Sequence, residues 1–117
     1  MKIKKKSVPL TANNLTKGVK NFIKLSGGWA VRVNTMGVYD AKNETYRKIA
    51  EEDRGVSDVV GCLNGKALFV EVKVGKDTES KYQKRFKKEM TRAGAVCIVA
   101  HDMDQFIEEI NQIIQML

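Results

Sequence analysis

Residues 55–73 read GVSDVVGCLNGKALFVEVK, and this stretch decides the fold of the chain. Two runs rich in β-branched and apolar residues flank Asn64 and Gly65, and an Asn-Gly pair between such runs is the strongest short-range signal for a β-hairpin. The pattern predicts one strand over residues 56–63 and a second, antiparallel strand over residues 66–74.

The two-residue turn also sets the register of this hairpin. It pairs Leu63 with Lys66, so Asp58 falls directly opposite Glu71. Opposite residues of antiparallel strands lie on one face of the sheet, with Cβ atoms ~4.5–5.5 Å apart. Lys73 follows Glu71 by two positions and shares that face, because side chains alternate along a strand. We therefore expect the hairpin to gather two carboxylates and an ammonium group.

This charge cluster has two interpretations. Facing carboxylates destabilise a sheet unless something offsets their repulsion, and carboxylate oxygens are ligands that suit Mg²⁺ or Mn²⁺. Alternatively, Glu71 and Lys73 lie on a solvated strand face, and Asp58 only caps the turn before it. The apolar residues that alternate with Glu71 favour the first interpretation, because they indicate a half-buried strand whose second face carries the charges.

Composition and length indicate a single globular domain, residues 1–117, with 43% hydrophobic and 30% charged residues. Residues 1–10 form a basic arm that we expect to be flexible. The longest apolar run, residues 95–100, is too short to span a bilayer, and no secretory segment follows the basic start. We expect a cytoplasmic protein, in a bacterial or phage-infected host cell. Cys62 and Cys97 fall in predicted strands and are expected to be reduced core residues.

The net charge of +7 is unevenly distributed. Four of the 14 acidic residues lie in residues 102–117, which contain no Lys or Arg, so the preceding part of the chain carries all 21 basic residues against ten acidic ones. A domain this basic is commonly drawn to nucleic acid, because contacts to phosphates release counterions. Other lysine-rich proteins share this composition, so charge alone does not choose a reaction.

Before the hairpin, the sequence predicts a helix, a strand and a loop. Thr11 is an N-cap candidate for a helix with an apolar stripe, and Gly27-Gly28 ends that helix. Alternation then predicts a strand over residues 29–35. Residues 36–54 show no clear period and read as an extended loop with a helical turn near residues 47–52, long enough to line a substrate cleft.

After the hairpin, the sequence predicts a helix, a strand and a second helix. Ser80 and Gln83 form a capping box, followed by a stripe expected to be buried: Tyr82, Phe86, Met90 and Ala93. Residues 95–100 predict a strand parallel to the Glu71 strand, since a helix connects the two. Asp102 can cap a last helix with an apolar side. The predicted class is α/β, with a mixed sheet flanked by helices on both sides.

These residues resemble the VRR-NUC family of the PD-(D/E)XK nuclease superfamily. The likeness covers residues 29–100 and lies in GVSD, FVEVK, SKYQ at the start of a helix, and AGAVCIVA. It implies a restriction-endonuclease-like fold. The compact stand-alone members of that family, many from phages, are structure-specific endonucleases that cut branched DNA such as Holliday junctions as homodimers.

The resemblance also implies roles for individual residues. Asp58 and Glu71 would bind Mg²⁺ or Mn²⁺ together with the Val72 carbonyl group. Lys73 would orient the attacking water or stabilise charge developing on the phosphate, and Gln83 would support the site from its helix. Chemistry alone leads to a compatible assignment, because carboxylate-held Mg²⁺ activates water and polarises a phosphodiester.

Two positions depart from the family pattern. Ser57 stands where the superfamily name has proline. Many relatives also place a glutamate on the first helix, whereas here that helix has Asn21 as its only oxygen-bearing candidate mid-helix, with Asp40 or Glu44 as possible substitutes from the following loop. The sequence therefore leaves open whether one or two ions bind.

Several basic residues are candidates for DNA contacts. Three arginines, Arg32, Arg47 and Arg54, are expected to flank the cleft and clamp phosphates. Other candidates lie on or near the basic helix, whose outer face either contacts DNA or is only solvated: Lys76, Lys81, Lys84, Arg85 and Lys88. His101 follows a strand end, where a hydrogen-bonded structural role is favoured over a general base.

The sequence predicts a metal-dependent endodeoxyribonuclease that acts on branched DNA. One alternative is a non-catalytic nucleic-acid-binding module on the same fold. A second alternative is a restriction-type or tRNA-directed nuclease of the same superfamily.

Overall fold

The computed structural model describes residues 10–33, 38–47 and 55–116. Within these ranges the chain forms three helices and six strands: α1 (Ala12–Leu25), β1 (Trp29–Arg32), β2 (Val38–Asp40), β3 (Thr45–Arg47), β4 (Val59–Leu63), β5 (Lys66–Val72), α2 (Lys81–Arg92), β6 (Val96–Ala100) and α3 (Met103–Met116). Among the described residues, no helix is both long and apolar enough to cross a membrane.

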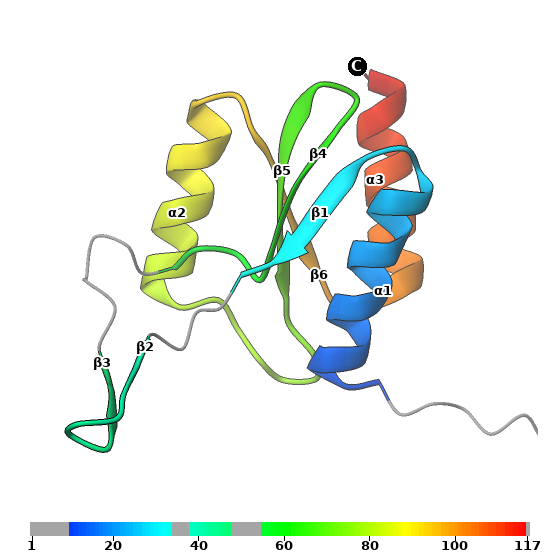
Figure 1. Ribbon diagram of the computed structural model, residues 1–117. Helices are drawn as coiled ribbons and strands as arrows, with labels where there is room; N and C mark the ends of the chain where they lie inside the picture. Colours follow the sequence, from blue (N-terminus) through cyan, green and yellow to red (C-terminus); the bar gives the residue numbers. More distant parts are fainter. Residues whose placement is uncertain (1–9, 34–37, 48–54, 117) are drawn as a thin grey trace, which may run out of the picture.

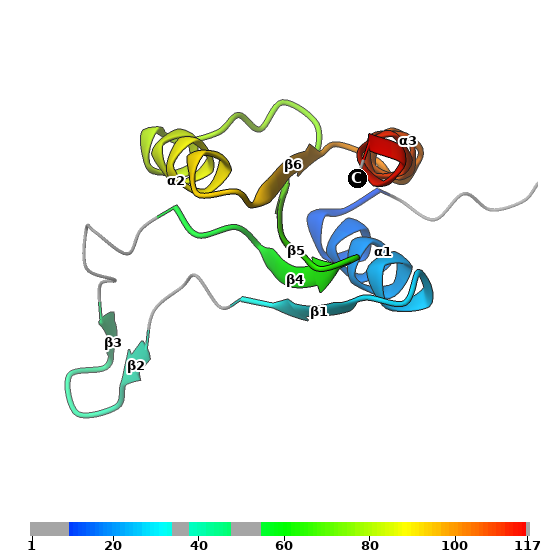
Figure 2. The ribbon, with the colours of Figure 1, turned by 90° about the horizontal axis from the view of Figure 1, so that it is seen from above.

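The centre of the fold is a four-stranded sheet in the order β1-β4-β5-β6. β4 pairs antiparallel with β1 and β5, whereas β6 runs parallel to β5. α1 and α3 lie together on one face of this sheet, and α2 lies on the other (Figure 1 and Figure 2). The predicted mixed α/β architecture is confirmed.

The Asn64-Gly65 turn has the predicted geometry. Both residues adopt positive φ, 50° for Asn64 and 77° for Gly65, as a two-residue turn matched to strand twist requires. Leu63 pairs with Lys66, and the ladder continues to Val59 opposite Val70. The predicted register is confirmed.

The core lies between the sheet and the α1–α3 pair. Alternate residues of β5, namely Leu68, Val70 and Val72, are buried on this side. They pack with the apolar stripes of α1 and α3, where Phe22 meets Phe106 edge to face with ring centroids 5.8 Å apart. The apolar side predicted for the last helix therefore packs on the sheet.

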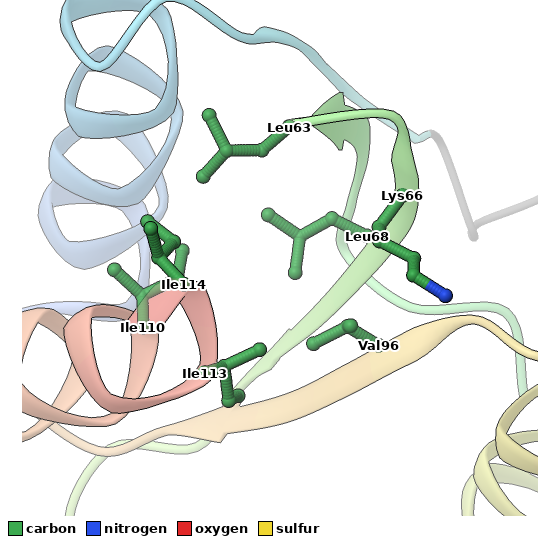
Figure 3. Close-up of a pocket in the computed structure, with 7 residues that line it drawn as sticks. All are labelled: Leu63, Lys66, Leu68, Val96, Ile110, Ile113 and Ile114. Carbon is green, nitrogen blue, oxygen red and sulfur yellow. The ribbon is translucent and has the colours of Figure 1, made fainter. Parts of the chain in front are cut away.

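Packing between α3 and the hairpin leaves one small apolar pocket of about 10 Å³ (Figure 3). Leu63 and Leu68 enter it from the hairpin, and Ile110, Ile113 and Ile114 enter from α3. Apart from Lys66 its lining is apolar, and it is too small for a ligand. It is a packing defect of the core rather than a functional site.

The helix α2 covers its side of the sheet only in part. Phe86 meets Phe69 of β5 edge to face, with ring centroids 5.2 Å apart. The structure describes all of α2, and no residue of this helix is fully buried. The prediction of a buried stripe on α2 is therefore wrong. Tyr82, Phe86 and Met90 are half-buried and Ala93 is exposed, because a single helix near the sheet edge has solvent on both sides.

Partial coverage by α2 also explains the cysteines. Both are free thiols, as expected, but Cys62 on β4 is exposed and Cys97 on β6 is half-buried. Cys62 alternates with the buried residues Gly61 and Leu63 of β4, so it lies on the face of the strand away from the core. The prediction that Cys62 is a core residue is therefore wrong.

The stretch between β1 and β4 differs from its prediction. The strand that starts at Trp29 ends at Arg32 rather than near residue 35. The expected loop contains a second small sheet, in which β2 and β3 pair through the register Tyr39 with Tyr46. Valine, threonine and tyrosine favour strands, which explains this hairpin. The helical turn expected near residues 47–52 lies mostly outside the described residues.

Gly55 brings the start of the hairpin segment against the first turn of α2. Its φ is +87°, and a Cβ atom at this position would clash with the Tyr82 carbonyl group. Gly65 also has positive φ, but a Cβ there would meet no described atom within 4 Å. Gly55 is therefore needed both for its backbone conformation and for close packing.

We predict that Gly55→Ala destabilises the protein more than Gly65→Ala does. Positive φ alone should cost about 1–2 kcal/mol in each variant. Gly55→Ala adds a clash with backbone atoms of α2, which only a shift of the chain can relieve. Urea unfolding of both variants measures the difference, and equal losses would show that Gly55 does not pack against α2.

Candidate active site

Glu71 is the most unusual side chain of the sheet. It lies on β5, on the face opposite the core, yet only 2% of its surface is exposed. Neither of its carboxylate oxygens accepts a hydrogen bond from any described residue. An ionised carboxylate in that situation is costly unless a cation or a proton compensates it. Glu71 therefore does not lie on a solvated strand face, and the alternative interpretation is wrong for this residue.

Asp58 directly precedes β4, which starts at Val59 rather than at residue 56, so the ladder with β5 ends before the predicted pair of Asp58 and Glu71. The Asp58 Oδ2 accepts a hydrogen bond of 2.8 Å from the Val72 amide, and its backbone carbonyl accepts one of 2.8 Å from the Val33 amide. The carboxylate thus takes the place of a backbone carbonyl where β4 leaves its ladder with β5. Asp58 closes the end of the sheet beside Glu71, and this structural role coexists with the predicted metal-binding role.

Lys73 lies two residues beyond Glu71 and is half-buried. Its amide donates to the Ala100 carbonyl at 2.9 Å, which ties the end of β5 to β6. Its carbonyl lies 3.1 Å from His101 Nδ1, and the His101 amide donates to Gln105 at 2.7 Å. The hydrogen-bonded structural role expected for His101 is confirmed.

An open hollow of about 440 Å³ adjoins Lys73. Residues from the end of β5, the segment before α2, α2 itself and the end of β6 line it: Lys73, Asp77, Thr78, Glu79, Lys84, Lys87, Val99 and His101. Three lysines on its wall make it suited to an anionic ligand, and phosphate is the obvious class.

Glu79 is a site residue that sequence reasoning missed. It lies just before the N-cap of α2, with 15% of its side chain exposed. Its Oε1 accepts a hydrogen bond and ion pair of 3.0 Å from Lys87 Nζ. Lys87 thus reaches from α2 to the segment before it, while 39% of its side chain stays exposed. Nothing in the sequence indicated this pair, because Glu79 belongs to neither a strand nor a helix.

The carboxylates of Glu71 and Glu79 act on each other. Burial first, then a hydrogen bond and repulsion from Glu79, raise the pKa of Glu71 to about 7, although Lys73 and Lys87 partly oppose this. Burial by itself raises the pKa of Glu79, but hydrogen bonds with Lys87 and with Glu71 outweigh it and lower that pKa below 4.5. The hydrogen bond between the two acids exists only when a proton joins them, since two ionised carboxylates only accept.

Gln83 serves the start of α2 in this structure. Its side-chain oxygen accepts from the Ser80 backbone amide at 2.9 Å, and the backbone amide of Gln83 donates to the Ser80 hydroxyl at 3.2 Å. The predicted capping box is thereby confirmed. Gln83 fixes the helix that carries Lys84 and Lys87, so any support it lends to the site passes through α2.

The structure places the candidates for DNA contacts in different regions. Arg32 donates to Asn13 Oδ1 on α1 at 2.6 Å, so it lies on the α1 side of the sheet and does not flank Glu71 as expected. The Arg47 side chain and the whole of Arg54 lie outside what the structure describes. The remaining candidates are exposed in the turn after β5 and on α2: Lys76, Lys81, Lys84, Arg85 and Lys88. Their contacts with DNA stay a prediction.

The donor atoms around Glu71 fit a hard divalent cation in kind. Glu71, Asp58 and the Val72 carbonyl would supply oxygen ligands, and the buried Glu71 oxygens have no donor among the described residues. No group of three or more acidic, histidine or cysteine side chains able to hold a metal occurs in the described ranges. Mg²⁺ is commonly held by one or two carboxylates with water and substrate phosphate, so this set suffices.

The candidates for a further acidic ligand do not join this set. Asn21 is exposed on α1, which packs on the opposite face of the sheet. Glu44 is exposed in the turn between β2 and β3, with φ of 51°, and the Asp40 side chain is not described.

Comparisons with known proteins bear on the fold. No family model matches the chain, and no curated protein matches it. A solved structure described as a VRR_NUC domain superimposes with a TM-score of 0.62 at 22% identity, covering 86% of this chain and 94% of that one. The two proteins share a fold, as the resemblance of the sequence implied.

We predict that Asp58→Ala and Asp58→Asn differ in stability. Alanine leaves the buried Val72 amide without its acceptor, which should cost roughly 1–3 kcal/mol. The amide oxygen of asparagine still accepts this bond, so Asp58→Asn should cost less than about 1 kcal/mol while it removes the charge. Urea unfolding in EDTA measures both, and equal losses would contradict the structural role of Asp58.

We predict that stability of the metal-free protein falls as the pH rises from 4.5 to above 7. The pKa of Glu71 is about 7 in the folded state and 4.5 when unfolded, so the folded state binds the extra proton. That stabilisation is complete below pH 4.5 and is lost as the pH passes 7, by roughly 1–3 kcal/mol. Glu71→Gln should remove the loss.

The matched control for this pH series is Glu89→Gln, since Glu89 is an exposed acid on α2. Urea unfolding between pH 5 and pH 8 should show the wild-type pH dependence in Glu89→Gln. A wild-type dependence retained in Glu71→Gln would place the titrating group elsewhere.

Proposed function

We propose that this chain, which has the fold of a VRR_NUC domain, is a metal-dependent nuclease of that family that cuts branched DNA such as Holliday junctions. The observation that carries the proposal is Glu71, a buried carboxylate that accepts no hydrogen bond from any described residue beside a lysine-walled hollow. Such a group is costly to keep, and binding of a cation offsets that cost.

Asp58, Glu71 and the Val72 carbonyl would hold Mg²⁺ or Mn²⁺. When bound, the ion supplies a more acidic water and a positive charge that polarises the phosphate. The protein contributes the shape of the site: Asp58 is held by the Val72 amide at 2.8 Å, so its second oxygen keeps a defined direction. Glu71 is held by burial between β5 and the segment that precedes α2.

Lys73 contributes the ammonium group of this site. It is half-buried, close enough to Glu71 to oppose the rise of that carboxyl's pKa, and it lines the hollow. In that place it can orient a water for attack or stabilise negative charge that develops on the scissile phosphate. Lys84 and Lys87 extend the same positive wall and would position the substrate phosphate.

DNA binding is supported by the overall charge of +7 and by the basic α2, at the edge of the hollow. Exposed Lys81 and Lys88 on α2 would contact the backbone, an interaction that is independent of sequence. The preference for branched DNA and the homodimer rest on the family resemblance. A homodimer would present two sites to the two strands of a junction.

Two observations are also compatible with a rival function. Asp58 has a purely structural bond to Val72, and a proton can replace a cation at Glu71, since its pKa is about 7. Both facts are compatible with a non-catalytic DNA-binding module. Cleavage therefore decides between the two functions.

The test is cleavage of a four-way junction, a flap, a linear duplex and a tRNA in EDTA, Mg²⁺ and Mn²⁺. We expect metal-dependent cutting of branched substrates by the wild type. Glu71→Gln and Lys73→Met should each slow it by about 100-fold or more while junction binding persists. Glu89→Gln serves as the control with normal activity, because that residue is exposed on α2.

Four other results would redirect the assignment. Junction binding that is insensitive to metal, without cutting, would favour the non-catalytic module. Cuts at fixed sequences in the linear duplex would indicate a restriction-type enzyme, and cutting confined to tRNA would indicate an RNA-directed one. Full activity in Glu71→Gln would contradict the site itself.

A further inference from the structure

A chain of hydrogen bonds holds His101 in the wall of the hollow beside Lys73. The His101 Nδ1 lies 3.1 Å from the Lys73 carbonyl oxygen, and the His101 backbone amide donates to Gln105 Oε1 at 2.7 Å. The Gln105 side chain donates to the Val99 carbonyl at 2.9 Å, and the Gln105 backbone amide donates to Asp102 Oδ1 at 2.8 Å. These bonds join the ends of β5 and β6 to the start of α3, so the imidazole ring keeps a defined place.

The bond to Lys73 decides which nitrogen of the imidazole ring carries a hydrogen. A carbonyl oxygen only accepts, so Nδ1 is the donor in this contact. In the neutral ring Nε2 then has a lone pair, and no described residue bonds to it. His101 is exposed and lines the hollow, so Nε2 is the ring nitrogen left for a ligand there. Nε2 becomes a hydrogen-bond donor only when the ring takes up a second proton and a positive charge.

The charges around the hollow make such a proton useful for binding an anion. The charged residues among its lining are three lysines and two acids: Lys73, Lys84, Lys87, Asp77 and Glu79. Three positive charges against two negative ones leave this wall at +1 while His101 is neutral, and a proton on His101 brings it to +2. A bound phosphate supplies the negative charge that favours the protonated ring.

We propose that His101 is a phosphate-binding residue of the hollow, which in its protonated form donates from Nε2 to a phosphodiester oxygen of DNA. This inference rests on the proposed function in taking DNA as the ligand. Uptake of the proton and binding of the phosphate favour each other, because each meets the opposite charge. The bond to Lys73 persists in both protonation states, since Nδ1 keeps its hydrogen. The structural role of His101 and its binding of phosphate therefore use different ring nitrogens.

Two acids outside this lining also bear on the pH dependence. Asp102 follows His101 directly in the chain, and its negative charge favours the protonated ring. Burial raises the pKa of Glu71 to about 7, so a second group near Lys73 titrates in the same pH range. Loss of the Glu71 proton adds negative charge and weakens the binding of a nearby anion. Glu71→Gln removes this second titration and is therefore the background for the pH series.

The test is binding of a single-stranded oligonucleotide of four thymidines in EDTA. It is followed by NMR of the imidazole of His101, which is the sole histidine of the chain. Each phosphodiester keeps one negative charge from pH 5 to pH 8, so the ligand adds no titration of its own. We expect the oligonucleotide to shift the imidazole resonances and to move the midpoint of their titration to higher pH. In Glu71→Gln, binding should be about 3- to 5-fold tighter at pH 5.5 than at pH 8, the effect of one added charge near the phosphate.

His101→Asn separates the two roles of the ring. The asparagine amide group can replace Nδ1 as the donor to the Lys73 carbonyl, but it has no counterpart of Nε2 and takes up no proton. Added to Glu71→Gln, this change should remove the pH dependence of binding and leave the free energy of unfolding in urea nearly unchanged. Lys88→Met in the same background is the matched control and should keep the pH dependence, because Lys88 is exposed on α2 and does not line the hollow.

Three results would overturn this inference and leave the proposed function standing, because none concerns metal-dependent cutting. They are imidazole resonances that do not move at saturating oligonucleotide, a pH dependence that survives His101→Asn, and a wild type that binds no oligonucleotide at millimolar concentration. Conversely, a protein that cuts no substrate but couples the proton of His101 to the oligonucleotide would support this inference and overturn the proposed function.

Discussion

The pairing of β4 with β5 is the constraint on which the rest of this structure depends. A turn of two residues with positive φ allows one register, and that register runs from Leu63 opposite Lys66 to the end of the ladder. A slip by one residue would move Leu68, Val70 and Val72 out of the core and put Glu71 into it. The same register therefore buries the apolar face of β5 and places Glu71 on the opposite face.

Burial of Glu71 is what turns this hairpin into a site. The strand alone would leave the carboxylate in water, but Glu71 is buried on the face of the sheet that carries α2 (Figure 2). The capping box at Ser80 and the close approach of Gly55 to Tyr82 fix α2 in place. Stability from the apolar core thus offsets the free-energy cost of burying the Glu71 carboxylate, and binding of a cation would reduce that cost.

Local patterns predicted the elements well where the chemistry is local. The N-caps at Thr11 and Ser80 and the stop at Gly94 were predictable, because a side chain there acts on backbone groups within a few residues. The exposure of Cys62 and the partial burial of Phe86 were not, since they depend on how much of the sheet a single helix covers. The β2–β3 hairpin escaped prediction because its strands are only three residues long.

The sequence by itself determined the Asn64-Gly65 hairpin and its register, from Leu63 opposite Lys66 to Val59 opposite Val70, and thereby put Glu71 on the face away from the core, because turn geometry and the two-residue period of a strand are local rules. Only the tertiary structure decided that Glu79 interacts with Glu71, that Lys87 pairs with Glu79, and that Arg32 donates to Asn13 on α1. Each of these contacts joins separate elements or a helix to the irregular segment before it. Their geometry depends on how helices pack against the sheet, which no local pattern encodes.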